Sequence, residues 1–184
     1  MLCKLFGLIN KVFYKIRFGS NVCFDGIPTF VQHMSVYVRS GNIKIGKNFR
    51  MNQGVYMAAL NGGEISIGNN VSINRNCILV CHDSISIADG CAIGPNTVFY
   101  DHDHKFGESG IESGFKTAPI VIEKNCWIGA GVTILRGTHI GEGSVIGAGS
   151  VIRGEIPAHS LATSGREIKV SPIEKRNKDK LLND

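Results

Sequence analysis

A six-residue repeat of aliphatic side chains constrains the fold of this chain more than any other feature. From residue 122 an isoleucine recurs at every sixth position: Ile122, Ile128, Ile134, Ile140, Ile146 and Ile152. Earlier segments keep this step, in the sets Ile45, Met51, Met57; Ile67, Ile73, Leu79; and Ile87, Ile93, Phe99. A period of six fits neither the 3.6-residue period of a helix nor the two-residue alternation of a strand. It predicts short strands joined by tight turns, with three hexads to each coil of a triangular prism.

Small residues occupy the other fixed positions of the hexad. Glycine often follows the aliphatic residue, where a tight turn favours it, and a small or β-branched residue comes four positions after it. Cys77, Cys91 and Cys126 fall in that second slot, so they are expected to be buried, reduced thiols. Cys77 and Cys81 lie near His82, but no second close pair completes a structural zinc site. No metal is expected.

The repeat also predicts how the chain is divided. Coils begin near residues 45, 67, 87, 122 and 140, and about seventeen surplus residues follow the third coil. The segment that contains this surplus, roughly residues 100–121, is polar and is expected to project from the prism as a loop. We expect an N-terminal helix over 1–20, a β-helical domain over 21–165 and a tail over 166–184.

Composition excludes several other classes of protein. Charged residues make up 19% of the 184 residues, below the usual ~25%, which argues against a disordered chain or a coiled coil. No run reaches the ~18 apolar residues that a membrane-spanning helix needs. The net charge is +5, but no basic stripe interleaved with aromatic residues indicates a nucleic acid partner.

Residues 1–18 form a basic, amphipathic segment. Lys4, Lys11, Lys15 and Arg17 occur there without any acidic residue, and apolar residues recur at three- and four-residue spacing. No unbroken apolar core or cleavage site of a signal peptide is present. Two interpretations remain open: a helix that caps the end of the prism, which we favour, or one that lies on an anionic membrane surface.

The hexad pattern resembles the left-handed β-helix hexapeptide-repeat acyltransferases over about residues 40–160. Within that family the chain is most similar to sugar O-acetyltransferases of the galactoside and maltose type, and closer still to those that decorate surface polysaccharides. The resemblance implies the left-handed sense of the coil, acetyl-CoA as co-substrate, and a homotrimer with active sites between neighbouring prisms.

The polar loop holds the candidate base. Its sequence begins with Tyr100 followed by Asp101, His102, Asp103 and His104. A neutral imidazole accepts a proton near neutral pH, and an adjacent carboxylate such as that of Asp101 can fix its tautomer. The resemblance implies that His102 is the general base. His104 is the reserve candidate, because the family pattern GHP reads DHD here.

The resemblance also implies where the co-substrate and the acceptor bind. The tetrapeptide IGAG occurs at 128–131 and again one coil later at 146–149, so Ala130 and Ala148 should stack on one edge. We assign both alanines, the nearby Arg153 and Gly154, and the single tryptophan, Trp127, to coenzyme A. For Arg166 and Lys169 we favour a solvated tail, with contact to the 3′-phosphate of coenzyme A as the alternative. The acceptor sugar is assigned to Asn74 and Asn76, although the sequence INRN also suits an ordinary turn.

These observations predict transfer of an acetyl group from acetyl-CoA to a sugar hydroxyl, in the cytoplasm and in polysaccharide biosynthesis. A membrane-bound helix would favour a lipid-linked saccharide on the inner face of the membrane as the acceptor. Three alternatives remain: N-acetylation of an amino sugar nucleotide, a scaffold that binds glycans without catalysis, and a metalloenzyme of the carbonic anhydrase type. The last would draw its ligands from His82, His102 and His104.

Overall fold

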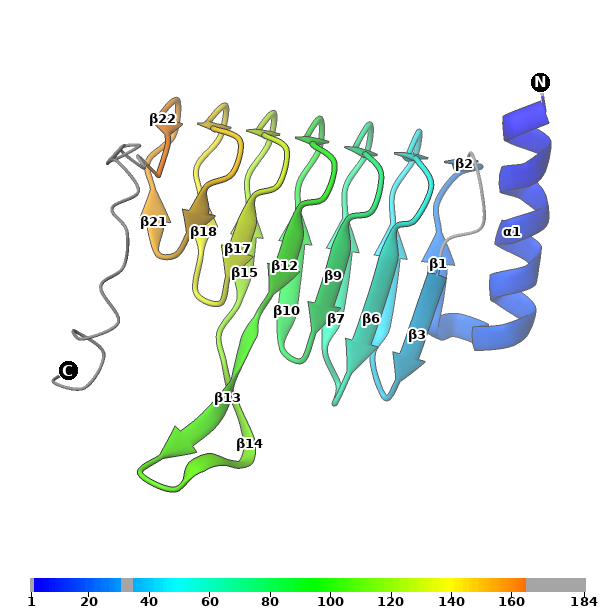
Figure 1. Ribbon diagram of the computed structural model, residues 1–184. Helices are drawn as coiled ribbons and strands as arrows, with labels where there is room; N and C mark the ends of the chain where they lie inside the picture. The colour runs from blue at the N-terminus through cyan, green and yellow to red at the C-terminus, as the bar shows by residue number, and fades with distance from the viewer. Residues whose placement is uncertain (1, 31–34, 165–184) are drawn as a thin grey trace, which may run out of the picture.

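The computed structural model describes residues 2–30 and 35–164 of the chain. These residues form an all-β solenoid with one α-helix, α1 (Leu2–Phe18), across its first end, followed by a short 3-10 turn, η1 (Gly19–Asn21). Figure 1 shows the coils stacked in chain order from that helix toward the C-terminus, with one hairpin leaving the solenoid partway along. The predicted all-β parallel helix with an N-terminal helix is confirmed.

Parallel strands stack along three faces of the solenoid. The first face contains β1 (Val22–Phe24), β4 (Asn42–Ile45), β7 (Glu64–Ile67), β10 (Ser84–Ile87), β15 (Ile120–Ile122), β18 (His139–Ile140) and β21 (Glu155–Ile156). The second contains β2 (Thr29–Phe30), β5 (Arg50–Met51), β8 (Ser72–Ile73), β11 (Ala92–Ile93), β16 (Trp127–Ile128), β19 (Val145–Ile146) and β22 (Leu161–Ala162). The third contains β3 (Ser35–Arg39), β6 (Tyr56–Leu60), β9 (Ile78–Cys81), β12 (Val98–Tyr100), β17 (Thr133–Leu135) and β20 (Val151–Ile152).

The hexad residues form the core as direct stacks. On the first face Ile45 pairs with Ile67, Ile67 with Ile87, and Ile87 with Ile122 across successive strands. Each of these isoleucines is at most 3% exposed. Burial of a side chain of this size contributes roughly 1.5–3 kcal/mol. The stacking of one hexad on the next, as the sequence predicts, is therefore the main source of stability.

The solenoid is longer than the aliphatic repeat indicates. A first coil precedes residue 45, with Phe24 stacked on Ile45 and Phe30 on Met51, and a partial coil follows residue 154. Phe24, Phe30 and Val36 keep the six-residue step. A search for aliphatic residues alone misses this coil because two of its three inward positions are aromatic.

Most corners after the first and second faces place a left-handed residue at a fixed position. Three positions after the inward residue, φ is positive at Asn48, Asn70, Asn76, Asn96, Asn125 and His159, or glycine occupies the site. Asparagine and glycine are the residues that adopt this conformation at least cost. We call the corners first, second and third, after the face that precedes each.

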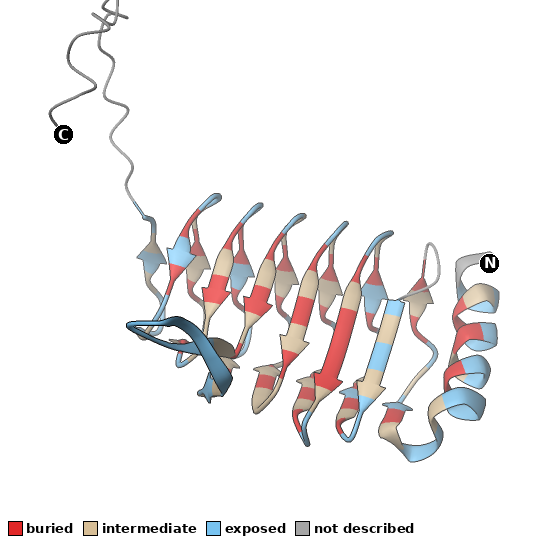
Figure 2. Cartoon of the chain, turned by 60° about the horizontal axis from the view of Figure 1, so that its bottom comes forward, coloured by how far each residue is buried: buried red, intermediate tan, exposed pale blue. Residues whose placement is uncertain are grey.

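The surplus residues after β12 fold as a hairpin rather than an irregular loop. β13 (His102–Gly107) pairs antiparallel with β14 (Gly110–Thr117), and the chain returns to the first face at β15. Most of the hairpin is exposed, in contrast to the buried inner surface of the coils (Figure 2). It leaves the solenoid at the third corner and so projects away from it.

Helix α1 closes the first end of the core. Tyr14 is 2% exposed and its ring lies 6.1 Å from that of Phe24. Gly7 approaches so closely that a Cβ atom there would lie 1.8 Å from the carbonyl oxygen of Pro28. The capping interpretation is therefore correct, and the outer face of the helix is exposed.

Candidate active site

The third corner of the fourth coil holds a buried carboxylate. Asp101 follows β12 and has no exposed surface. Its carboxylate accepts hydrogen bonds from the main-chain N–H of His82 at 2.9 and 3.0 Å and from that of Asp83 at 2.7 Å. Two N–H groups of the preceding coil thus compensate the burial of its charge.

His102 lies against this carboxylate. Its Nδ1 atom is 3.0 Å from Oδ1 of Asp101, and its side chain is 12% exposed. An ionised carboxylate only accepts hydrogen bonds, so Nδ1 of His102 carries the proton. The other ring nitrogen, Nε2, then has a lone pair for a proton from outside the ring.

His82 lies one coil before His102 and stacks on it. The two ring centroids are 4.0 Å apart, and the amide Nδ2 of Asn61 lies 2.9 Å from Nδ1 of His82. Burial and the neighbouring His102 ring hold the pKa of His82 below its ordinary value. His82 is therefore neutral at pH 7, and its N–H and ring fix the position of Asp101 and His102.

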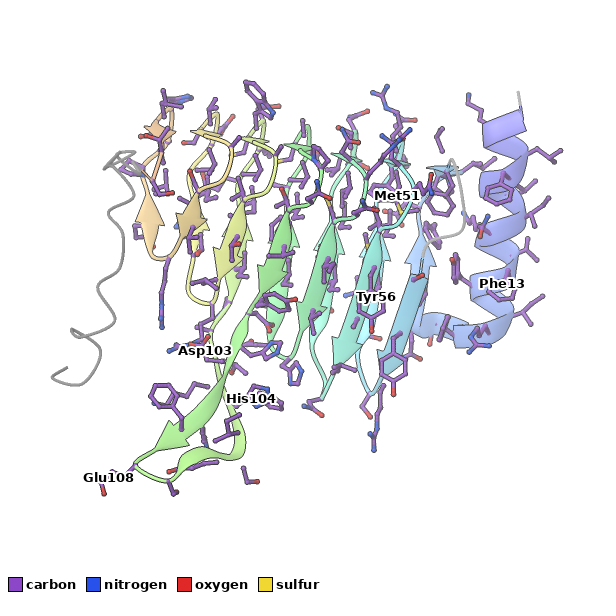
Figure 3. All side chains as sticks on the ribbon, viewed as in Figure 1. Phe13, Met51, Tyr56, Asp103, His104 and Glu108 are labelled. Atoms are coloured by element: carbon purple, nitrogen blue, oxygen red, sulfur yellow. The ribbon has the colours of Figure 1, made fainter. Side chains whose placement is uncertain are left out.

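The hairpin covers this pair of rings with one aromatic side chain. Phe115 of β14 lies 4.3 Å from His82, 5.2 Å from His102 and 4.8 Å from His104, measured between ring centroids. It reaches them because β14 pairs with β13 in a register that sets Phe115 opposite His104. His104 itself is exposed, and Figure 3 shows it beside Asp103 where the hairpin leaves the solenoid.

Two arginines approach the same corner from later coils. Nε of Arg136 lies 2.5 Å from Oδ2 of Asp103, and a terminal nitrogen of Arg153 lies 4.0 Å from the same oxygen. Both arginines follow third-face strands, so they line up along the third corner beyond His102. Arg153 is about half exposed, which leaves its guanidinium accessible to an anionic group.

No thiol at this corner has the character of a nucleophile. Cys81 is buried, and its burial together with the nearby Asp101 carboxylate raises the pKa of the thiol well above its ordinary value. A thiol attacks as the thiolate, so Cys81 is inert at neutral pH. The arrangement is suited to general-base chemistry at Nε2 of His102.

Ala130 and Ala148 do stack, but on the second corner. Both are exposed, and the N–H of Gly149 donates to the carbonyl of Ala130 at 2.8 Å. Among the residues that the structure describes, no hydrogen bond uses the N–H of Ala130 or Ala148. The corner therefore presents small side chains and main-chain donors. Within one chain the third face lies between this second corner and His102 at the third corner.

The other residues assigned to coenzyme A lie on the second face and at the third corner, or outside the described residues. Trp127 is 59% exposed and lies on the second face, where it pairs with Ala92 of the preceding coil. Arg153 and Gly154 lie at the third corner, on the same edge as His102. Arg166 and Lys169 lie outside the described residues, as does the whole predicted tail over 166–184.

Asn74 and Asn76 lie at the second corner rather than beside His102. Oδ1 of Asn74 accepts from Asn52 at 2.9 Å and from the N–H of Arg75 at 2.8 Å. Asn76 has a φ of 56° and contacts Asn96 of the next coil. Both side chains take part in the turn, and within one chain they lie away from the candidate base, so their assignment to the acceptor stays a prediction.

The three histidines of the metalloenzyme alternative do gather around Phe115. Over residues 2–30 and 35–164, however, no group of three or more His, Cys, Asp or Glu side chains is placed to hold a metal ion. The cluster is built by ring packing instead, with Phe115 among the imidazoles.

Sequence reasoning missed His82 as a partner of His102, and also Phe115. His82 could have been found, because the third and fourth coils differ by 20 residues, as Ile67 and Ile87 do, and the same offset relates His82 to His102. Phe115 carried no such signal, because it depends on the pairing of the hairpin strands.

Comparison with known proteins relates this chain to a family of bacterial transferases. The model of the bacterial transferase hexapeptide family, with six repeats, matches residues 119–154. A putative lipopolysaccharide biosynthesis O-acetyl transferase, WbbJ of Escherichia coli K12, is 29% identical over 170 residues, covering 87% of this chain and 84% of that protein. The putative acetyltransferase SAR2635 of Staphylococcus aureus MRSA252 is 42% identical over 124 residues, covering 67% of this chain and 62% of its own length.

One similar solved structure contains bound acetyl coenzyme A. The hexapeptide-repeat acetyltransferase VCA0836 of Vibrio cholerae, in complex with acetyl coenzyme A, superposes with a TM-score of 0.52 at 27% identity. The match covers 77% of this chain and 67% of that one. The present chain thus spans less than two thirds of the staphylococcal relative and about two thirds of this structure.

Proposed function

We propose that this chain, a member of the hexapeptide-repeat family, transfers an acetyl group from acetyl-CoA to a hydroxyl of a sugar. Acetyl transfer is supported by the relatives and by the structure of VCA0836 with acetyl coenzyme A. The choice of a hydroxyl, and a role in bacterial surface polysaccharide, follow the description of WbbJ and are part of the proposal.

One observation carries the proposal: the contact between Asp101 and His102. Nδ1 of His102 donates to the buried carboxylate at 3.0 Å, which directs the lone pair of Nε2 away from the carboxylate. The positive charge that the ring acquires in the reaction is stabilised by the same carboxylate. Asp101 acts here as the residue that orients and stabilises His102.

The reaction follows from this arrangement as a direct transfer. Nε2 of His102 accepts the proton of the sugar hydroxyl while the oxygen attacks the thioester carbonyl of acetyl-CoA. The tetrahedral intermediate collapses with loss of the thiolate, which recovers the proton from His102. A main-chain N–H stabilises the developing oxyanion, an effect typically worth about 3 kcal/mol. No covalent intermediate with the protein is needed.

The proposed site is completed by a second copy of the chain. The base lies at the third corner, whereas the small, amide-rich edge of Ala130 and Ala148 lies at the second. A homotrimer would bring the third corner of one prism beside the second corner of its neighbour. The exposed Trp127 on the second face would then lie near this cleft. Its assignment and those of Arg153 and Gly154 to coenzyme A remain proposals.

Acylation of an amine is the competing reaction at the same base. A sugar hydroxyl is not acidic, so it gains more from deprotonation by His102 than an amine that is already neutral when it attacks. We therefore favour the hydroxyl. A cytoplasmic location, where acetyl-CoA is available, belongs to the same proposal. Over the described residues, no helix is long and apolar enough to cross a membrane.

The test is a transfer assay with matched acceptors. Purified protein is incubated with acetyl-CoA and with neutral saccharides or amino sugar nucleotides, and release of free coenzyme A is followed together with the mass of the product. We expect a mass gain of one acetyl group on a saccharide whose ester is cleaved by mild base. A base-stable product formed only from the amino sugars would instead assign N-acylation.

A further inference from the structure

The outer face of α1 is apolar and exposed. Leu5 is 57% exposed, Ile9 53%, Val12 51% and Ile16 81%. Leu8 and Phe13 border them and are also exposed. In a helix these positions fall on one side, at the three- and four-residue spacing of a single face. A contiguous apolar stripe of this size on one helix face indicates a partner.

This stripe is separate from the face that caps the solenoid. Asn10 and Tyr14, on the opposite side of the helix, are at most 2% exposed and Gly7 contacts Pro28. Figure 1 shows α1 running across the end of the coils, and Figure 3 marks Phe13 on the helix. Within the described part of the chain, the buried side of the helix packs on the coils, and the apolar stripe lies on the other side.

The charges of the helix lie beside the exposed stripe and are all positive. Lys4, Lys11 and Lys15 lie on one flank at spacings of seven and four residues, or about two turns and one turn, and Arg17 lies on the other. The first turn has no acidic residue, and neither does the rest of the helix. Long basic side chains can extend their charged ends toward water and phosphate while their stems cover apolar surface.

We propose that α1 docks this protein on an anionic lipid bilayer, with the stripe of Leu5, Leu8, Ile9, Val12, Phe13 and Ile16 among the acyl chains. Lys4, Lys15 and Arg17 contact lipid phosphates at the rim. An exposed apolar face flanked only by cations complements a bilayer that is apolar inside and negative at its surface. A second copy of the chain, whose helix carries the same positive charge, is a poorer match because the two sets of cations would repel each other.

This docking fixes the orientation of the solenoid. Because α1 runs across the first end, the coils would stack upward from the membrane surface (Figure 1). His102 follows the fourth strand of the third face, three strand spacings or about 15 Å above the first coil. If the proposed function is correct, the base is held at a height suited to a saccharide carried on a lipid. The docking itself does not depend on that function.

The test is sedimentation of the full-length protein with vesicles of phosphatidylcholine alone or mixed with phosphatidylglycerol. We expect the protein to sediment with the mixed vesicles at low salt and much less with phosphatidylcholine. The double variant Val12→Glu/Ile16→Glu should lower the partition constant by about 100-fold, because two buried aliphatic side chains are replaced by charges. Lys4→Gln/Lys15→Gln should lower binding to the mixed vesicles by about fivefold for each cation.

The matched control is Ile111→Glu/Leu161→Glu, which places the same two charges on equally exposed apolar residues far from α1. Ile111 is 78% exposed and Leu161 74%. This control should bind like the parent, and all variants should keep the parent's thermal transition. The proposal is overturned if the parent does not sediment with anionic vesicles, or if the control loses binding as much as the helix variant. It is also overturned if light scattering shows a larger assembly that only Val12→Glu/Ile16→Glu dissociates, since the stripe would then bind a second copy.

Discussion

The carboxylate of Asp101 lies 3.0 Å from Nδ1 of His102 while it also accepts two main-chain N–H groups of the preceding coil. The stacked coils therefore form the core and also position the side chains of Asp101 and His102. The N–H groups of His82 and Asp83 hold the carboxylate, and the carboxylate holds the imidazole. The geometry of the proposed base is fixed by the solenoid rather than by the exposed hairpin.

Asp101→Asn should impair the reaction more than the loss of one contact would suggest. The amide can donate to Nδ1, which favours the wrong tautomer, and it no longer stabilises the charged ring. We expect turnover to fall by at least about 100-fold with little change in the KM for acetyl-CoA. His104→Ala is the control, since that exposed ring lacks a carboxylate partner among the described residues. A greater loss in His104→Ala than in Asp101→Asn would reassign the base.

Ala148→Leu tests the proposed edge for coenzyme A. The larger side chain would cover the small second corner, so the KM for acetyl-CoA should rise by about tenfold or more, as loss of one or two contacts would produce. Ala158→Leu is the matched control, because Ala158 is also exposed two positions after an inward isoleucine but lies at the first corner. Equal kinetics in the two variants would remove the second corner from the site.

Much of this fold follows from local rules, and the site follows from them only in part. Ile45, Ile67 and Ile87 stack directly because each inward position repeats at the same place in its coil, so spacing alone predicts the core. The aliphatic repeat does not mark the first coil, although the predicted β-helical domain over 21–165 includes it, because Phe24 and Phe30 replace aliphatic residues. Phe115 reaches the imidazoles through an antiparallel pairing, and no periodic signal specifies that register.

Asn76 occupies a position that the corner itself requires, so its assignment to the acceptor sugar stays a prediction. Its left-handed backbone and its contact with Asn96 satisfy the needs of the corner. The turns of such a solenoid favour asparagine or glycine at these positions, whatever the function of the protein. An asparagine at such a position is therefore weak evidence for substrate binding. Its position relative to His102 is the stronger evidence.

Gly7→Ala should destabilise the protein although alanine favours helices. The helix propensity of alanine exceeds that of glycine by about 1 kcal/mol, but the new Cβ atom would lie 1.8 Å from the carbonyl oxygen of Pro28. Relief of such a clash would separate α1 from the first coil, so we expect a net loss of about 1–3 kcal/mol in the free energy of unfolding. Urea denaturation measures it, with Lys4→Ala as the exposed control. A gain in stability would show that α1 is not held against Pro28.

Stability should depend on pH through His139. Its imidazole lies 3.0 Å from Glu123 and 2.9 Å from Glu155, and the hydrogen bond to Glu123, followed by the charge of Glu155, raises its pKa above the ordinary 6.5. The stabilisation from a raised pKa is present in full below pH 6.5 and is lost as the pH rises through the folded-state pKa. His139→Gln should therefore lower the Tm more at pH 6 than at about pH 8.5. An equal decrease at both values would show that the ion pairs do not stabilise the fold.

The central claim is that His102 is the base of an acetyl transfer, and one paired measurement tests it most directly. Acetyl-CoA is titrated calorimetrically into the parent and into His102→Ala, and turnover with the acceptor found for the parent is measured for both. The account predicts that the two bind acetyl-CoA alike while the variant turns over about 10²–10⁴-fold more slowly. Near-parental turnover in His102→Ala would contradict it.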